Sequence, residues 1–196
     1  FYFYIIKFHN ASIDPMLAGN IFCSFISTIF EDSAGRIWFG TYNDGVGYID
    51  EQNTFQLIDL KSLSRNQTIF KLVENGKKEV IAFSQESIIN LTTGDVFNYQ
   101  TEGISISKQN NNQVRGASLD SCTFLMTEYG NFLKFDICNF SLISKSTLNE
   151  TDKTAVFTSI EPDNQLWIGL MNGGMIKLNE ELQLTVKYLE QYTVTG

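Results

Sequence analysis

The sequence has few of the residues that usually carry catalysis or nucleic-acid binding. Its 196 residues include one histidine, His9, and only three arginines, and 14 Lys and Arg are outnumbered by 22 Asp and Glu. A single histidine does not provide the usual ligand set of a zinc enzyme or the base of a histidine-dependent hydrolase. A formal charge of −8 opposes the clustered cations that phosphate binding needs. We therefore expect no metal, no cofactor, no catalytic residue and no nucleic-acid partner in this segment.

Long apolar runs and paired cysteines are also scarce. No run approaches the ~18 residues that cross a bilayer, so we expect no membrane segment in this chain. The apolar run Phe1–Ile6 is six residues long, lacks a basic flank and is interpreted as a strand. Cys23, Cys122 and Cys138 are odd in number and are not spaced as a zinc knuckle. The prediction for all three is a buried free thiol.

Aromatic residues and glycines are plentiful by contrast. The chain has 16 Phe, 8 Tyr and 2 Trp, and 14 Gly accompany only 2 Pro. Aromatic residues favour strands, and glycines favour tight turns between them. The composition therefore indicates a β-rich protein.

An internal repeat is visible around the two tryptophans. The segment around Trp38 aligns with the segment around Trp167 at a constant offset of 129 and without a gap. That offset is three periods of 43, so two degenerate copies are expected between them, with apolar residues at the tryptophan position. Ile81 and Phe124 occupy those positions and are the predicted packing residues of the two middle copies.

Each copy has the same order of strands and turns. In the first copy, a strand ends in an Asp-x-x-Gly turn, where Asp32 can cap backbone amides and Gly35 can adopt positive φ. A second strand, a turn that ends in Gly45, a third strand and an outer strand follow. Asn131 and Gly174 end the corresponding turn in the third and fourth copies and are also tolerant of positive φ.

The second strands, such as the one around Trp38, are apolar at successive positions, so both of their faces must be buried. Four short strands per ~43 residues match one antiparallel blade of a β-propeller, and blades packed face to face supply that double burial. We expect an all-β fold, a partial β-propeller over residues 1–196 with about four four-stranded antiparallel blades. The blades are placed at residues 22–60, 66–101, 112–146 and 153–190, and residues 1–8 are interpreted as the outer strand of a preceding blade. This phase predicts an open arc with exposed apolar blade faces.

The segment Ile29–Thr41, followed by Gly45, Val46 and Asp50, resembles the two-component regulator propeller repeat. The family pattern runs Ile-x-Glu-Asp-x-x-Gly-x-Ile-Trp-Ile-Gly-Thr, then a Gly-Gly-Leu turn and an Asp. The resemblance implies the periplasmic sensor region of a bacterial hybrid two-component system, with histidine kinase activity in other domains of the parent protein. It also implies that the partners are an oligosaccharide or other small ligand, the remaining propeller blades and the signalling domains. The residues assigned a structural role in the repeat are Asp32, Gly35, Trp38, Gly40, Gly45, Trp167, Gly169 and Gly174.

A ligand is expected on the face of the ring that bears the turns between second and third strands. The linkers between blades lie on the same face, including the long polar linker Thr101–Arg115. Tyrosine rings can stack on sugar C–H groups, while amides and carboxylates can bond sugar hydroxyls, so substitution of Tyr42 or Tyr129 is expected to weaken glycan binding without changing the melting temperature. The candidate ligand residues are Tyr42, Asn43, Asp44, Glu128, Tyr129, Met171 and Asn172.

Two other function classes remain. One is a protein interaction or dimerisation scaffold that binds no small molecule. The other, ranked lower, is a glycosidase or lyase built on the same fold, which one histidine and three arginines disfavour. Screening glycan fragments by thermal shift would separate the sensor from the scaffold, because a ligand that binds only the folded state raises the melting temperature.

Overall fold

The computed structural model describes residues 25–52, 54–60, 68–104, 115–128, 131–147, 155–160, 166–170, 174–179 and 181–188. Several predictions from the sequence therefore lie outside the described residues: the strand at 1–8, His9, Cys23, most of the 101–115 linker, and the candidate ligand residues Tyr129, Met171 and Asn172.

The described chain is built from antiparallel four-stranded sheets. Their strand orders are β1-β2-β3-β4, β5-β6-β7-β8, β9-β10-β11-β12 and β13-β14-β15-β16, so each sheet is one blade of consecutive strands, named here blades 1 to 4. The bounds are β1 Ile26–Glu31, β2 Ile37–Thr41, β3 Val46–Ile49, β4 Phe55–Ile58, β5 Ile69–Glu74, β6 Val80–Ser84, β7 Ser87–Asn90, β8 Val96–Asn98, β9 Arg115–Ser118, β10 Thr123–Glu128, β11 Asn131–Asp136, β12 Ser141–Thr147, β13 Ala155–Ile160, β14 Leu166–Leu170, β15 Met175–Leu178 and β16 Leu184–Tyr188.

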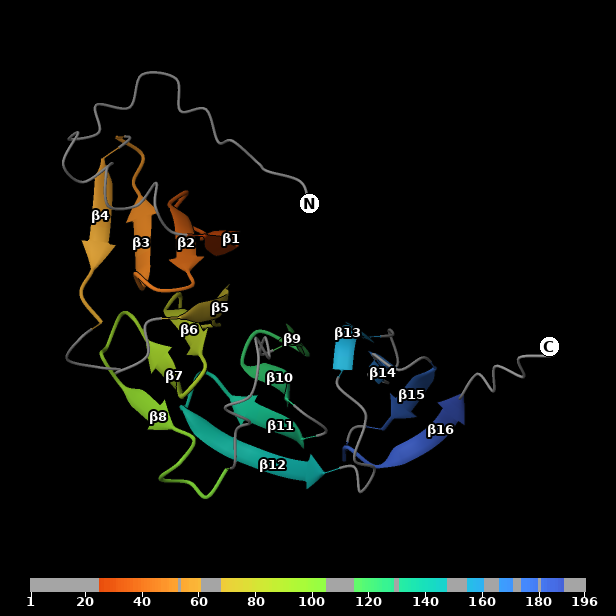
Figure 1. Ribbon diagram of the computed structural model, residues 1–196. Coiled ribbons are helices and arrows are strands. Elements are labelled where there is room, and N and C mark those ends of the chain that lie inside the picture. The colour runs from red at the N-terminus through yellow and green to blue at the C-terminus, as the bar shows by residue number, and fades with distance from the viewer. Residues whose placement is uncertain are drawn as a thin grey trace, which may run out of the picture.

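The blades follow one another around an arc (Figure 1). The first strands β1, β5, β9 and β13 lie toward the inside of the arc, and the last strands β4, β8, β12 and β16 lie outside. Neighbouring first strands contact each other, β1 with β5 and β9 with β13. The prediction of a partial β-propeller with four-stranded antiparallel blades is confirmed. The described part of the chain contains no helix of the length and hydropathy needed to cross a membrane.

The core lies in the seams between blades. We call the blade face that packs against the preceding blade the leading face, and the face that packs against the following blade the trailing face. Trp38 on the trailing face of blade 1 is 4% exposed and packs in one cluster with Leu72, Val80 and Ala82 of blade 2. Because each blade between two others has two such faces, all residues of β6 are buried.

The third copy of the repeat has a different register from the predicted one. Phe124 packs backwards against blade 2, where its ring lies 4.2 Å from the ring of Phe83. Leu125 packs forwards with Leu166 and Ile168 of blade 4, so Leu125 and not Phe124 stands at the position of Trp38. Both residues are 0% exposed. The predicted packing residue was therefore wrong, because burial on both faces leaves no polar alternation that would fix the register.

A shorter connection between β10 and β11 causes this shift, because Leu125 pairs with Lys134 nine residues later, whereas Trp38 pairs with Tyr48 ten residues later. The turn before β10 differs as well. Asp32 caps the backbone N–H groups two and four residues after it, those of Ala34 and Arg36, both at 3.0 Å. Asp120, its counterpart in blade 3, caps the N–H groups two and three residues after it, those of Cys122 and Thr123. The β9–β10 turn in blade 3 is thus also one residue shorter, and an ungapped alignment shows neither change.

Turn glycines behave largely as the sequence predicts. Gly35, Gly45 and Gly174 have φ of 77°, 79° and 88°. In blade 2 the position of Gly35 is taken by Lys78, which adopts the same left-handed region with φ 65°. The expectation for Asn131 was wrong, since this residue is the first of β11 and pairs with Glu128 across a two-residue turn.

Two of the three cysteines form a disulfide, so the prediction of free thiols was wrong for Cys122 and Cys138. Cys122 lies in the β9–β10 turn and Cys138 in the β11–β12 turn, with a Cα–Cα distance of 5.0 Å. Both turns emerge at the same edge of blade 3, and Ile137 N–H donates to the carbonyl of Cys122 at 2.7 Å. Antiparallel pairing of β10 with β11 therefore brings together two cysteines that are 16 residues apart.

Candidate functional site

The ring has two edges of different chemistry. One edge carries the turns between second and third strands, and we call it the β2–β3 face. The other carries the turns between first and second strands and between third and fourth strands, and we call it the β1–β2 face. The antiparallel strand order 1-2-3-4 within each sheet produces this separation.

The β1–β2 face is dominated by turns that an Asp or Asn side chain closes. In blade 1, Asp50 accepts from the N–H groups of Gln52 and Thr54 at 3.0 and 2.7 Å. In blade 2, Asn90 accepts from those of Thr92 and Thr93 at 3.0 and 3.1 Å. The carboxylates and amides of these turns are engaged by their own backbone, so they serve the fold. Among the described residues, further turns of this face are closed in the same way by Asp32, Asn75, Asp120, Asp136 and Asn179.

Asp32 is the most deeply engaged of these carboxylates. One oxygen accepts from the indole Nε1 of Trp38 at 2.7 Å and from Nε of Arg36 at 2.6 Å. Burial raises the pKa of Asp32, but the hydrogen bonds from Trp38 and Arg36 and the charge of Arg36 outweigh it and leave the pKa below its ordinary value. The carboxylate therefore stays ionised and fixes the tryptophan that fills the seam with blade 2.

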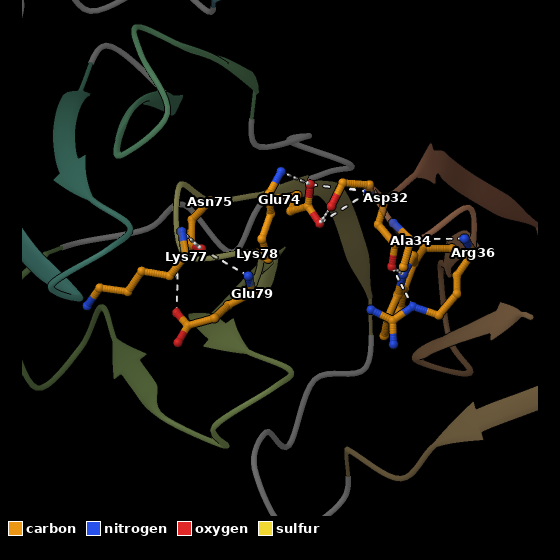
Figure 2. A network of polar contacts seen from close by, with 10 residues as sticks. Asp32, Ala34, Arg36, Glu74, Asn75, Lys77, Lys78 and Glu79 are labelled. Carbon is orange, nitrogen blue, oxygen red and sulfur yellow. Dashed lines mark hydrogen bonds and ion pairs between the residues drawn. The ribbon is translucent and has the colours of Figure 1, made fainter.

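The β1–β2 face also joins blades to each other. Ser33 of blade 1 donates from its backbone N–H and hydroxyl to Glu74 of blade 2, the hydroxyl at 2.8 Å. Figure 2 shows the side chain of Glu74 next to the turn that Asp32 closes. The next turn uses the same donor position with a different acceptor, since Gly76 N–H donates to the carbonyl of Ser121 in blade 3 at 2.6 Å. Lys77 adds a bond from Nζ to the carbonyl of Cys138 at 2.6 Å, next to the disulfide.

The β2–β3 face carries the candidate ligand residues that the structure describes. Asn43 and Asp44 are exposed in the turn after β2, and the N–H of Asp44 donates to Oγ1 of the buried Thr41 at 2.9 Å. Gly45, with its left-handed backbone, ends this turn and returns the chain into β3. Side chains of both polar residues are thus held on a rigid turn and face solvent. For Glu128 the structure describes the backbone only, as the last residue of β10.

Tyr42 is only partly exposed, because it also contacts blade 2. Its ring packs edge-on against the ring of Phe70 in blade 2, with centroids 6.4 Å apart. Its carbonyl accepts a hydrogen bond from Oγ1 of Thr68, and its N–H donates to the carbonyl of Phe25 at 3.1 Å. These bonds place the segments that enter β1 and β5 beside the β2–β3 turn. Tyr42 therefore holds the seam as well as facing the candidate site.

Two polar residues on this face were missed by the reasoning from sequence. Gln85 and Glu86 form the turn between β6 and β7, and Glu86 is exposed. The hydroxyl of Ser84 accepts from the N–H groups of Glu86 and Ser87 at 3.3 and 3.0 Å, which holds the turn. The signal was available, because the blade 2 turn lies one repeat after Asn43 and Asp44. The blade 2 turn contains no glycine, so the glycine pattern of the repeat does not mark it.

The polar groups of the β2–β3 face suit neutral hydroxylated ligands better than anions. The exposed side chains of its described turns carry carboxylates at Asp44 and Glu86 and an amide at Asn43, and the linkers add the carboxylates of Asp59 and Glu102. Among the residues that the structure describes, no three His, Cys, Asp or Glu side chains are grouped so that they could hold a metal ion.

Comparison with known proteins gives one sequence family and a set of related folds. Residues 20–43 match the family model described as the two-component regulator propeller. The predicted resemblance to this repeat is confirmed for the first blade, and the match covers Asp32, Gly35, Trp38 and Gly40. A search of curated proteins gives no match.

Solved structures share the fold at low sequence identity. The extracellular domain of the putative hybrid two-component system BT4673 from B. thetaiotaomicron is 13% identical with a TM-score of 0.66, over 82% of this chain and 23% of that one. The corresponding domain of BT3049 from the same organism is 15% identical with a TM-score of 0.57, over 84% and 22%. Virginiamycin B lyase from Staphylococcus aureus is 13% identical with a TM-score of 0.65, over 87% and 57%. This chain spans about a quarter of the two receptor domains, and all three likenesses concern the fold.

Proposed function

We propose that this chain, whose first blade carries a two-component regulator propeller repeat, is a ligand-sensing segment of an extracytoplasmic receptor. The observation that carries the proposal is the family match at residues 20–43. Similar folds in extracellular domains of hybrid two-component systems support it. In this role the segment binds a ligand and performs no catalysis, and kinase activity belongs to other domains of the parent protein.

The disulfide supports a periplasmic location. Disulfides persist in oxidising compartments and are rare where glutathione and thioredoxin keep thiols reduced. The Cys122–Cys138 bridge joins two turns of blade 3. Lys77 and Gly76 of blade 2 donate hydrogen bonds to carbonyls of the same two turns. In a compartment that keeps the bridge oxidised, the bridge holds these two turns, and therefore their carbonyls, in position for the bonds from blade 2.

The proposed ligand class is an oligosaccharide, bound at the β2–β3 face. Asn43, Asp44 and Glu86 provide the amide and carboxylates that can bond sugar hydroxyls, and the ring of Tyr42 provides an apolar surface beside them. Tyr129, Met171 and Asn172 occupy corresponding turns of blades 3 and 4 in the sequence and are proposed to extend the same site. Glu128 is assigned to it from its position at the end of β10.

The test is a thermal-shift screen of the full receptor sensor region against glycan fragments, followed by calorimetry with any fragment that raises the melting temperature. Asn43→Ala and Asp44→Ala are expected to weaken binding at least tenfold while the melting temperature of the free protein stays the same. Gln52→Ala is the matched control, because Gln52 is exposed on the β1–β2 face.

Tyr42 needs a conservative change. Tyr42→Ala also removes the contact with Phe70, so a loss of binding would be mixed with a loss of stability. Tyr42→Phe keeps the ring and removes the hydroxyl. Unchanged affinity for Asn43→Ala, Asp44→Ala and Tyr42→Phe together would place the ligand elsewhere, and the absence of any stabilising glycan would favour the scaffold function.

A further inference from the structure

One turn of blade 2 is bonded to blade 3 at the β1–β2 face. Among the described residues, three hydrogen bonds run from this turn, and each ends on a carbonyl of a disulfide-bonded cysteine or of the residue before one. The bonds run from Gly76 N–H to Ser121 at 2.6 Å, from Asn75 Nδ2 to Ile137 at 2.9 Å and from Lys77 Nζ to Cys138 at 2.6 Å. Figure 2 shows the side chain of Lys77 extending from its turn toward the blue-green ribbon of blade 3.

The disulfide joins the two turns of blade 3 that supply these carbonyls. Cys122 lies between β9 and β10, and Cys138 lies between β11 and β12. Both cysteines are just beyond Thr123 and Asp136, the last pair of β10 and β11. Ile137 N–H adds a hydrogen bond to the carbonyl of Cys122 at 2.7 Å. Cleavage of the bridge is therefore expected to loosen the two turns at the point where blade 2 is bonded to them.

The seam between blades 1 and 2 has an acceptor of another kind. Ser33 of blade 1 donates to the carboxylate of Glu74 in β5. The two turns of blade 2 on this face, residues 75–79 and 90–95, contain no cysteine. A reductant can therefore act on the seam between blades 2 and 3 and leave the seam between blades 1 and 2 unchanged.

The two cysteines of the bridge differ in exposure. Cys122 is half-buried and its neighbour Ser121 is exposed, whereas Cys138 is only 9% exposed. Sγ of Cys122 lies beside Gly76, because a Cβ on this glycine would be 3.1 Å from it. An incoming thiolate therefore reaches Cys122 before Cys138, next to the turn of blade 2.

We propose that the Cys122–Cys138 bridge is a thiol–disulfide exchange site whose reduction by a protein dithiol releases this edge of the seam while the blades stay folded. A thiolate of the dithiol attacks Sγ of Cys122, the bond between the two sulfurs breaks, and Cys138 leaves as a thiolate that takes up a proton. The second thiolate of the dithiol then attacks its own partner sulfur in the mixed disulfide, and Cys122 leaves and is protonated in turn. The bridge gains two electrons and two protons, and the dithiol is oxidised to a disulfide.

The apolar part of the same seam does not depend on the bridge. The rings of Phe83 and Phe124 lie 4.2 Å apart and belong to one buried cluster. The pairing of β10 with β11 continues from Thr123 to Glu128, away from the cysteines. Reduction is therefore expected to release the polar edge and to leave the blades packed against each other.

Hydrogen exchange measured by mass spectrometry tests the release. The protein carries Cys23→Ser, so that no third thiol exchanges with the bridge, and is compared in the oxidised form and after reduction with dithiothreitol. Exchange in peptides that span residues 74–79 is expected to rise at least about tenfold, because Gly76 loses a fixed acceptor. Strands β6 and β10 are expected to stay protected over the same time, and so is the turn at 32–36 of blade 1.

The matched control is Cys122→Ser with Cys138→Ser in the same Cys23→Ser protein. This variant is expected to show the fast exchange of residues 74–79 both with and without dithiothreitol. An effect of the reagent on anything other than the bridge would appear in this variant as well.

The exchange chemistry is tested with a thioredoxin whose second active-site cysteine is replaced by serine, because its mixed disulfide is not resolved. Folded Cys23→Ser protein is expected to capture this probe at Cys122, which peptide mapping identifies. Protein unfolded in urea is expected to capture it at Cys122 and Cys138 alike, since both sulfurs are then accessible.

Three results would overturn the proposal. One is capture of the thioredoxin probe only in urea, which would make the bridge a structural one. Another is a reduced protein in which residues 74–79 exchange as slowly as in the oxidised form. The last is loss of protection in β6 and β10 together with that turn, because reduction would then unfold the blades.

Discussion

Asp32 links a turn, a side chain and a seam through one carboxylate. One oxygen caps the turn through the N–H groups of Ala34 and Arg36, and the other accepts from the indole of Trp38 and the guanidinium of Arg36. Blade 2 has Asn75 at this position, with its amide nitrogen donating to Glu79 at 2.8 Å. The two side chains are therefore adapted to opposite partners, donors at Asp32 and acceptors at Asn75.

Asp32→Asn is expected to destabilise the protein by about 2 kcal/mol at neutral pH. The new amide group would point its N–H donors at the donors of Trp38 and Arg36, and a buried donor would lose its acceptor. Urea unfolding monitored by tryptophan fluorescence measures the change. Asp44→Asn, in an exposed turn on the β2–β3 face, is the matched control and is expected to leave the unfolding midpoint unchanged. Equal midpoints for Asp32→Asn and the natural protein would contradict the role given to this carboxylate.

The pH dependence of stability follows from the same residue. The pKa of Asp32 lies below its ordinary value in the folded state, because hydrogen bonds from Trp38 and Arg36 outweigh the effect of burial. Its contribution is fully present above the unfolded pKa of about 3.9 and is lost as the pH falls through the folded pKa. The difference in unfolding free energy between the natural protein and Asp32→Asn is expected to be constant from pH 7 to about 5 and to shrink below about pH 4. A difference that does not change with pH would show that this carboxyl titrates normally.

At the scale of single residues, the sequence was informative where a residue has a backbone role. The caps of Asp32 and the positive φ of Gly35 and Gly45 follow from the side-chain chemistry and could be predicted. The contact of Tyr42 with Phe70 could not be predicted, because it joins two blades whose relative placement the turn pattern does not contain.

At the scale of strands, Gly40 marks a close approach between blades. A Cβ at this position would lie 2.7 Å from Cγ2 of Ile69 and 2.8 Å from Cγ2 of Thr28. The first strand of blade 2 therefore comes closer to β2 than any side chain permits. Blade 4 also has glycine at this place, Gly169, whereas blade 2 has Phe83.

Gly40→Ala is expected to destabilise the protein by about 2 kcal/mol, because overpacking a tight seam displaces its neighbours. Thermal unfolding by circular dichroism measures the effect. Gly94→Ala is the comparison, since Gly94 has a φ of 84° and no atom within 4 Å of the position of a Cβ. That change tests backbone strain alone and is expected to cost about 1 kcal/mol. A smaller effect for Gly40→Ala than for Gly94→Ala would contradict the close approach.

The disulfide fixes two turns that the neighbouring blade uses. Carbonyls of Ser121, Ile137 and Cys138 accept from Gly76 N–H, Asn75 Nδ2 and Lys77 Nζ respectively. Cys122→Ser with Cys138→Ser is expected to lower the unfolding free energy by about 3 kcal/mol, from the entropy of closing a loop of this length. Unfolding of both proteins with and without a reducing agent measures it, and the double variant is expected not to respond to the agent. An equal response of both proteins would mean that the bridge is not formed in solution.

At this scale the sequence predicted the existence and order of strands better than their register. The strands of blade 4 lie at the constant offset from those of blade 1 that the sequence predicts, and β5 and β6 of blade 2 follow β1 and β2 by one period. In blade 3 the connection between β10 and β11 is one residue shorter than that between β2 and β3, and the register of β10 moves with it. Phe124 is aromatic like Trp38, so it matched the expected pattern although Leu125 occupies the position. The disulfide partner of Cys122 could not be identified from the spacing of the cysteines alone.

At the scale of the whole molecule, the described blades are joined by seams, and each buried cluster joins one blade to its neighbour. Such an arrangement behaves as a one-dimensional stack, and its stability is approximately a sum of blade and seam terms. Tyr42, Asn43 and Asp44 lie on a turn at one edge of that stack, so the site depends on how the seams align the blades. The face and its polar turns, including the turn at Glu86, could be predicted from the repeat, whereas the seam role of Tyr42 required the structure.

Phe124 and Leu125 allow this view to be tested, since they are adjacent, equally buried and face opposite seams. Phe124→Ala is expected to destabilise the seam between blades 2 and 3 by about 3–4 kcal/mol, and Leu125→Ala the seam between blades 3 and 4 by about 2–4 kcal/mol. Hydrogen exchange measured by mass spectrometry separates them. Faster exchange is expected in β6 and β7 for Phe124→Ala and in β14 and β15 for Leu125→Ala, with blade 3 affected in both. A single cooperative unit would exchange faster throughout in either variant. An identical pattern for the two substitutions would therefore show that the two seams do not open separately.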